Sequence, residues 1–353
     1  MKIPEYTSLE EKGYSLNVKT PAKTFEQYQC IVEADVFDEW YNKHELQSNL
    51  FFRGVKEAKY KNFTSAQRLY FTQDYHNVGP SELIQAQIDE MRKVHEDIFS
   101  QYCKSMGMPC TDLFLMSCSQ HHKNGISPLL DFTSHLDTAL FFMCYGTQSP
   151  TSGIGDSNVL DINNFVSLYS FSRKKQYSLQ NICNALVESI KTEAMESSVE
   201  KEHRVKLSEE LKKIKNQEHI ANIFREKIIV FFSYPNLHHA LYQLVDYSPI
   251  LIVNEPLKIK IIDYETEAKF TISNLNIVAQ HGCFLYHDKG ISPLEKGLSC
   301  VDIHKSLIPY IVNKYLKPKH IDESLLFPTE DNLVNEATFN MMANIVAPST
   351  KAE

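Results

Sequence analysis

An arginine inside an apolar segment is the first residue whose chemistry calls for an explanation. Arg53 follows Phe51 and Phe52 and precedes Gly54. A guanidinium is permanently charged, and its fork of donors suits phosphate or carboxylate. The glycine beside it removes a side chain, so that a ligand can come close to the backbone. Two interpretations stay open: Arg53 faces solvent from the polar face of a strand, or it is held inward to bind an anion.

A second candidate site lies in SQHHKNG, where Gln120, His121 and His122 precede a turn. A histidine beside a polar turn titrates near neutral pH and can act as a general acid or base. Adjacent histidines point in different directions on a strand, so they do not form a ready metal pair. His122 is therefore a catalytic candidate, and a hydrogen-bonded structural histidine is the alternative.

A carboxylate and two hydroxyls follow in LLDFTSHLDTALFF, residues 129–142. Thr133 or Ser134 is expected to cap the helix that begins near residue 134, and the spacing of Ser134 and Asp137 resembles a capping box. Hydroxyls at a helix N-terminus also form a phosphate or ribose site. The two interpretations are compatible with each other. Asp131 lies two residues before Thr133 and is therefore close to these hydroxyls in the sequence.

The last candidate is Gln280 in AQHGCFLYH, residues 279–287, at the expected end of an apolar strand. A neutral amide can orient a ligand. It cannot act as a carboxylate base, because it has no proton equilibrium near neutral pH. A structural amide that is bonded to backbone is the alternative.

The elements that must position these residues alternate without a regular βαβ rhythm, so we expect an α+β fold. The highly charged region at about 179–226 predicts a helical insertion, which is either solvated or a protein-docking surface near 190–220. Periodicity predicts helices over 25–44, 82–105, from 134, 306–317 and 331–346, and strands over 49–55, 166–172, 227–235, 257–264 and 274–287.

Composition predicts an ordinary globular protein. Of 353 residues, 43% are hydrophobic and 23% are charged, and the net charge is -8. The acidic balance disfavours broad attraction to nucleic acid. We expect no membrane span, because no apolar run reaches the length of a bilayer. The start of the chain lacks an apolar signal core and the eight cysteines lack zinc spacing, so we expect reduced thiols, no metal and a cytoplasmic location.

Four blocks in a fixed order resemble the FRG domain family: Phe52-Arg53-Gly54, then HHKNGISPLLDFTSHLDTALFF, IVAQHGCFLYH and HKSLIPYIVNKYLKPKHIDESLLFP. Together they cover about residues 45–330. The resemblance implies a single FRG-type domain over 1–353, with a core at about 45–290, the insertion at about 179–226 and a C-terminal helical segment at 300–350. Many members carry threonine-arginine where Ser127-Pro128 stands here, so a second anion-binding arginine is absent from that position.

The order of these blocks is also similar to that of the ADP-ribosyltransferases. This weaker resemblance implies an ADP-ribosyltransferase-like fold, with a mixed, split β-sheet, flanking helices and NAD as substrate. Arg53 then anchors the NAD phosphate or ribose, Thr133 and Ser134 support the nicotinamide pocket, and Gln280 stands where a glutamate is usual. An amide supplies only a dipole to the oxocarbenium-like state of the reaction. The implied catalyst is therefore Asp131 or a histidine, or the site only binds.

The resemblances imply an NAD-using or NAD-cleaving effector, a toxin of a bacterial defence or toxin–antitoxin system, that acts on a protein or nucleic-acid acceptor. The alternative is a non-catalytic module that binds a nucleotide, another anion or a protein. The expected catalytic residues are Asp131, Gln280 and His122, and the expected nucleotide-binding residues are Arg53, Gly54, Gln120, His121, Thr133 and Ser134.

Overall fold

A computed structural model describes residues 2–18, 28–72, 78–105, 115–116, 120, 125–150, 160–172, 250–252, 258–262, 269–273, 279–287, 291–295 and 297–327. The expected helices at 179–226 and 331–346 and the expected strand at 227–235 lie outside these residues. In the part that is described, none of the helices has the length and apolar character needed to cross a bilayer. Cys144, Cys283 and Cys300 are buried free thiols.

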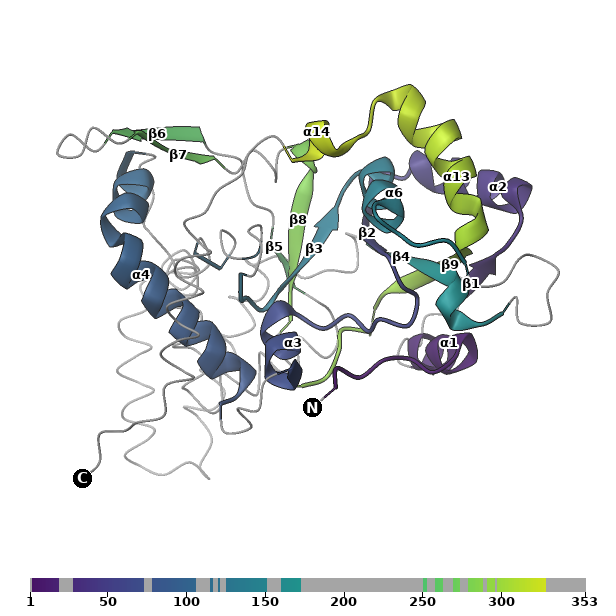
Figure 1. Cartoon of the computed structure of the whole chain (residues 1–353), viewed down its shortest axis with the longest axis horizontal. Coiled ribbons are helices and arrows are strands. Elements are labelled where there is room, and N and C mark those ends of the chain that lie inside the picture. Colours follow the sequence, from purple (N-terminus) through teal and green to yellow (C-terminus); the bar gives the residue numbers. More distant parts are fainter. Residues whose placement is uncertain are drawn as a thin grey trace, which may run out of the picture.

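Seven strands form one mixed sheet in the order β1-β9-β4-β2-β3-β8-β5 (Figure 1). Strand β1 runs parallel to β9, and the other neighbours are antiparallel. The α+β class is therefore confirmed. The strands are β1 Tyr28–Ile31, β2 Leu50–Val55, β3 Leu129–Thr133, β4 Phe165–Ser172, β5 Ile250–Ile252, β8 Gly282–Tyr286 and β9 Ser299–His304, and a separate hairpin consists of β6 Lys258–Ile262 and β7 Lys269–Ser273.

The sheet is weakly joined between β2 and β3. These strands share a single register pair, Phe52 with Thr133, whereas β2 pairs along its whole length with β4. Strand β3 in turn pairs along its whole length with β8. Arg53, one residue beyond this pair on β2, and Asp131, two residues before it on β3, therefore lie where the two halves of the sheet diverge, and the side chain of Arg53 donates to the main-chain oxygen of Asp131 across the opening.

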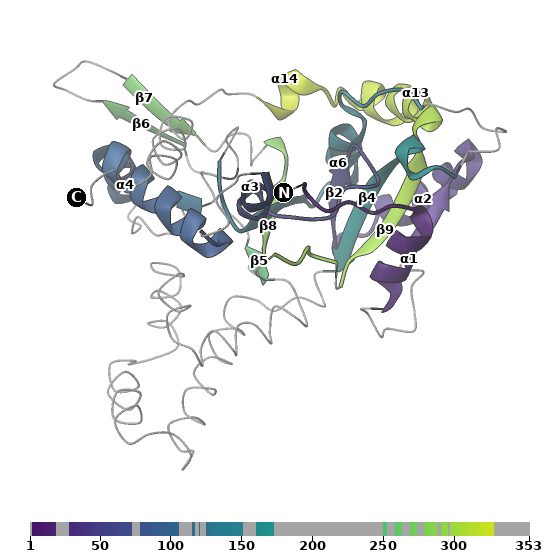
Figure 2. The same cartoon turned by 60° about the horizontal axis from the view of Figure 1, so that its bottom comes forward.

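Helices cover both faces of the sheet (Figures 1 and 2). Helices α2, α6 and α13 pack on one face, against a cluster that includes Phe52, Leu168 and Val301. Leu16 of α1 packs on the other face with Phe51 and Tyr169. The helices are α1 Leu9–Val18, α2 Ala34–Glu45, α3 Ser65–Thr72, α4 Pro80–Ser105, α6 Leu136–Cys144, α13 Ile308–Ile311 and α14 Glu323–Leu326, with short 3₁₀ or π turns at Ile162–Asn164, Lys305–Leu307, Val312–Leu316 and Lys317–Lys319.

Most of the expected elements that fall on described residues are confirmed. The helices predicted over 82–105, from 134 and over 306–317, and the strands predicted over 49–55, 166–172 and 257–264, correspond to observed elements. The helix predicted over 25–44 is wrong in its first part, where β1 precedes α2. The backbone pairing of β1 with β9 overrides the local helical periodicity there. Of the expected strand 274–287, residues 274–278 lie outside the described residues, and among the rest the strand begins at Gly282.

Candidate functional site

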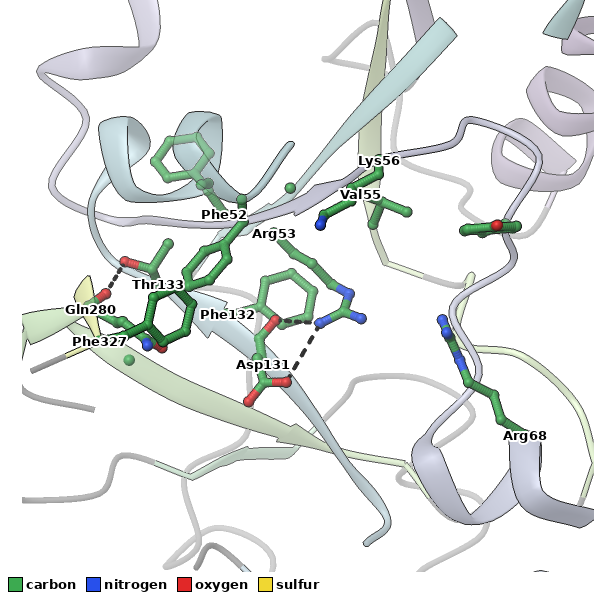
Figure 3. A pocket seen from close by; sticks show the side chains of 15 residues that line it. Phe52, Arg53, Val55, Lys56, Arg68, Asp131, Phe132, Thr133, Gln280 and Phe327 are labelled. Atoms are coloured by element: carbon green, nitrogen blue, oxygen red, sulfur yellow. Dashed lines mark hydrogen bonds and ion pairs between the residues drawn. The ribbon is translucent and has the colours of Figure 1, made fainter. Parts of the chain in front are cut away.

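A cavity of about 390 Å³ opens where β2 and β3 diverge (Figure 3). Five of the residues predicted from the sequence line it: Arg53 and Gly54 from β2, Asp131 and Thr133 from β3, and Gln280 from the turn before β8. The structure therefore brings them together from three separate parts of the chain. The cavity is also lined by the cations Lys56 and Arg68 and by the rings of Phe52, Tyr60, Phe132, Phe142 and Phe327.

Arg53 is held inward, because only 17% of its side chain is exposed. Its Nη1 donates to the main-chain oxygen of Asp131 at 2.9 Å and lies 3.9 Å from the Oδ2 of that residue. Its Nε is buried and has no hydrogen-bond partner in the described residues. Burial lowers the pKa of Arg53, and the carboxylate of Asp131 opposes that shift. The guanidinium thus bridges the opening in the sheet and keeps donor capacity for an anion.

Asp131 is oriented by Gln120. The Nε2 of Gln120 donates to Oδ2 of Asp131 at 2.5 Å, and the hydroxyl of Ser127 donates to Oε1 of Gln120 at 2.6 Å. Oδ1 of Asp131 is covered and has no partner among the described residues. Burial raises the pKa of Asp131, while Arg53 and Gln120 act against the increase. Gln120 is not part of the cavity wall, so it positions the carboxylate and its expected direct contact with a ligand is not supported.

Thr133 fastens the turn that forms one wall of the cavity. Its hydroxyl donates to the main-chain oxygen of Gln280 at 2.6 Å and accepts from the backbone N–H of His135 at 3.0 Å. The N-cap of α6 is His135, which has no side-chain cap bond. The prediction that Thr133 or Ser134 caps this helix is therefore wrong, because β3 continues through Thr133. Ser134 is exposed and does not line the cavity.

The capping box predicted between Ser134 and Asp137 is also absent. Asp137 instead accepts from the hydroxyl of Tyr41 at 2.7 Å and from the ammonium of Lys319 at 2.8 Å. These contacts join α6 to α2 and to the C-terminal helical turns. The carboxylate lies in the first turn of α6, but its hydrogen bonds with Tyr41 and Lys319 are tertiary contacts and not helix-capping bonds.

Gln280 lies in a turn and does not end a strand as expected. Its Nε2 donates to the main-chain oxygen of Leu326 at 2.9 Å, and its side chain is buried. The next residue, His281, has a φ of 48°, which turns the chain into β8. The amide thus joins this turn to α14. The contacts therefore support the alternative interpretation of Gln280 as a structural amide that is hydrogen-bonded to backbone.

Gly54 is required by packing. A Cβ on this residue would lie 2.0 Å from the main-chain oxygen of Ala139 and 2.7 Å from the backbone nitrogen of Met143. Helix α6 therefore lies directly against the backbone of β2 at this point. The expectation that the glycine exists to admit a ligand is corrected: the space above it is filled by α6, although Gly54 still borders the cavity.

Two cations of the cavity were not identified from the sequence. Lys56 follows β2 directly, and its Nζ lies 5.0 Å from the ring centroid of Tyr145. Arg68 extends from α3 toward the space that Arg53 faces (Figure 3). Burial lowers the pKa of Arg68 to about 10, and the positive charge of Arg53 adds to the shift. Three cations and one carboxylate give the wall a formal charge that favours an anionic ligand.

The predicted histidine candidates are not placed by the structure, since His121 and His122 lie outside the described residues. Among the described residues, no group of three or more histidine, cysteine, aspartate or glutamate side chains is arranged to hold a metal ion. The candidate chemistry of the cavity therefore depends on the cations, on Asp131 and on the aromatic rings.

Comparison with known proteins gives one match. A family model described as the FRG domain matches residues 48–152, a range that contains β2, α3, β3 and α6. No curated protein and no solved structure matches the chain. The matched range contains Arg53, Lys56, Arg68 and Asp131, so it supplies all of the charged residues of the cavity.

Proposed function

We propose, from the premise that this chain is an FRG domain protein, that the cavity between β2 and β3 binds the phosphates and ribose of an NAD-type nucleotide. The observation that carries this proposal is the grouping of Arg53, Lys56 and Arg68 around a single carboxylate, Asp131. Guanidinium groups pair with phosphate oxygens in a bidentate manner, and a lysine adds a point charge. The aromatic rings of the wall suit a nucleobase or a nicotinamide ring.

The reaction that we propose breaks the bond between nicotinamide and C1′ of the ribose, releases nicotinamide, and forms a new bond from C1′ to the oxygen of water or to a nucleophile of an acceptor, which loses its proton. Its transition state resembles an oxocarbenium ion, which a nearby carboxylate stabilises electrostatically. Gln280 does not supply that charge, because an amide is neutral, and its Nε2 already donates to the main-chain oxygen of Leu326. Asp131 is the acidic residue of the cavity wall, and its side chain is 42% exposed, so its carboxylate is the group that would accept from a ribose hydroxyl. A sheet that opens beside the anchoring arginine supports the further proposal of an ADP-ribosyltransferase-like fold; the role of a toxin or defence effector would follow only from NAD cleavage of this kind.

Calorimetric titration with ADP-ribose and with NAD tests the binding step. Lys56→Met is the informative variant, because Lys56 is exposed and its loss does not disturb the core. We expect it to weaken ADP-ribose binding about tenfold, the order of one lost charge-assisted hydrogen bond. Arg53→Met should weaken binding further. Lys43→Met on α2 is the matched control, since Lys43 is exposed and does not line the cavity.

Two results would contradict the proposal: no heat of binding at millimolar ADP-ribose, or an equal loss of affinity in the Lys43→Met control. The catalytic part is tested separately by chromatographic detection of nicotinamide released from NAD, with and without candidate acceptors. Binding without release, in the presence of protein and nucleic-acid acceptors, would favour the second candidate function, a module that binds the nucleotide without cleaving it. The tie of Gln280 to Leu326 is the observation that favours this second candidate.

The affinity for ADP-ribose should depend on pH through Asp131. Its pKa is raised by burial, so it takes up a proton at a higher pH than an ordinary aspartate. Protonation removes the negative charge of the wall, so anion affinity should rise, up to about tenfold, as the pH is lowered through the raised pKa of Asp131. The pyrophosphate of ADP-ribose does not titrate in this range. For Asp131→Asn, the affinity for ADP-ribose should not change with pH over the same range. If the affinity of this variant depended on pH as strongly as that of the wild type, a group other than Asp131 would be responsible.

A further inference from the structure

A second cavity of about 390 Å³ lies at the other end of β2, under the C-terminal half of α2. Trp40 and His44 of α2 form its roof, and Leu50 at the start of β2 borders it. The first cavity is lined by the other end of this strand and by the residue that follows it, from Phe52 to Lys56. The two cavities have no lining residue in common.

The floor of this second cavity is polar where the sheet would ordinarily be apolar. Ser170 pairs with Ser299, and the neighbouring pair on the same face is Leu168 with Val301. Leu168 and Val301 are buried in the main hydrophobic cluster. Since directly opposite residues share a face and alternate residues point the same way, the two serine hydroxyls continue the core face of the sheet. Hydroxyls thus replace apolar side chains where the cavity begins.

All of the polar groups that line the second cavity are uncharged at neutral pH. They consist of amides and hydroxyls together with the imidazole of His44: Gln29, Gln47, Asn49, Ser170, Ser172 and Ser299. Amides and hydroxyls both donate and accept hydrogen bonds, whereas a wall for an anion needs cations. A phosphate placed here would lose its hydration without gaining a charge partner.

His44, which lines the cavity, has a ring nitrogen that is free to accept a hydrogen bond. Its Nδ1 lies 2.7 Å from the main-chain oxygen of Trp40, which can only accept, so Nδ1 carries the hydrogen. Burial lowers the pKa of His44, which keeps the ring neutral at pH 7. Nε2 then has a lone pair, and it has no hydrogen-bond partner among the described residues. The ring stacks on Trp40 with centroids 4.4 Å apart, so both side chains are fixed.

We propose that this second cavity binds an uncharged, hydroxyl-rich small molecule, either a nucleoside or a free sugar. The hydroxyls of such a ligand match the donors and acceptors of the serine and amide floor, and the lone pair of His44 accepts from one of them. The volume is that of a small-molecule site. This proposal does not depend on nucleotide binding in the cavity between β2 and β3.

Trp40 makes the test specific, because it is the single tryptophan of the chain and it lies in the wall of this cavity. Its fluorescence is followed at pH 7.5 during titration with adenosine, uridine, glucose and N-acetylglucosamine, and with AMP and glucose 6-phosphate as charged counterparts. We expect a saturable change with a nucleoside or with a sugar, and at least fivefold weaker binding of the phosphorylated form. Saturation by the nucleosides alone, or by the sugars alone, identifies the source of the ligand.

The double variant Ser170→Val Ser299→Val removes the hydroxyls of the floor and keeps residues that suit a strand. We expect it to weaken the neutral probe about tenfold, while Lys56→Met leaves the Trp40 response unchanged. A fluorescence change that does not saturate for any neutral probe overturns the proposal. Equal or tighter binding of the phosphorylated probe, or a double variant that binds as tightly as the wild type, also overturns it.

Discussion

Gly54→Ala is expected to lower the free energy of unfolding by about 3 kcal/mol or more. The added methyl group would lie 2.0 Å from the main-chain oxygen of Ala139 and 2.7 Å from the backbone nitrogen of Met143. Both atoms belong to the backbone of α6, so no change of rotamer relieves the overlap. The helix must move away from β2 or the strand must bend, and either movement disrupts the cluster that contains Phe52 and Leu140.

Urea denaturation measures this loss, and Gly79→Ala is the matched control. The nearest atom to a Cβ at Gly79 is a carboxylate oxygen of Glu82 at 4.0 Å, which is an ordinary contact. We therefore expect the control to change stability by less than about 1 kcal/mol. Equal stability of the two variants would show that α6 does not lie on Gly54. Because Ala139 and Phe142 line the first cavity, the Gly54→Ala variant should also lose affinity for ADP-ribose.

The sequence was informative where local pattern and tertiary structure agree. The apolar run around Phe52 predicts β2, and helical periodicity predicts α4, because each pattern matches the period of its own element. Strand β1 could not be predicted in this way, since it is defined by its parallel pairing with β9. Strand β9 is also hard to predict from the sequence, because Asp302, a charged residue, stands in the middle of this buried strand.

The candidate site was predicted in part for a similar reason. The order of the sequence blocks predicts that Arg53, Asp131, Thr133 and Gln280 meet, and all four line one cavity. The spacing of residues along the sequence does not show that Arg68 of α3 lies beside the same cavity as β2, so Arg68 was not predicted as a site residue. The direction of a hydrogen bond also depends on the local backbone. The hydroxyl of Thr133 therefore fastens a turn where a helix cap was expected.

The second large effect is expected from Lys12→Met, which removes the cation of a fully buried ion pair. Nζ of Lys12 lies 2.6 Å from Oδ1 of Asp302, and both side chains are 0% exposed. The ammonium also donates to Ser167 Oγ at 2.6 Å and to the main-chain oxygen of Ala58 at 3.0 Å. Loss of the cation leaves the carboxylate buried without its counter-charge, which costs about 3–5 kcal/mol.

A surface lysine provides the comparison for the same substitution. The side chain of Lys2 is 88% exposed and lies 3.8 Å from Glu5, so Lys2→Met should leave the denaturation midpoint unchanged. The double variant Lys12→Met Asp302→Asn should recover much of the lost stability, because it removes both charges and keeps a side chain that can accept from Tyr28. If the double variant were no more stable than Lys12→Met, the lost stability would come from the lost packing and hydrogen bonds of Lys12 and not from the unpaired charge of Asp302.

The stability that Lys12 contributes should also depend on pH in a defined direction. Burial is the largest influence on the pKa of Lys12 and acts to lower it, but the charge and hydrogen bond of Asp302, together with the contribution of Cys300, raise the pKa above its ordinary value. A cation whose pKa is raised by folding contributes fully below the unfolded pKa of about 10.4 and loses that contribution as the pH rises through the folded value. The difference in unfolding free energy between wild type and Lys12→Met should therefore be constant from pH 7 to about 9.5 and shrink at higher pH. A difference that instead grows at alkaline pH would show that the pKa of Lys12 is lowered by folding, so that Lys12 contributes hydrogen bonds and not an ion pair.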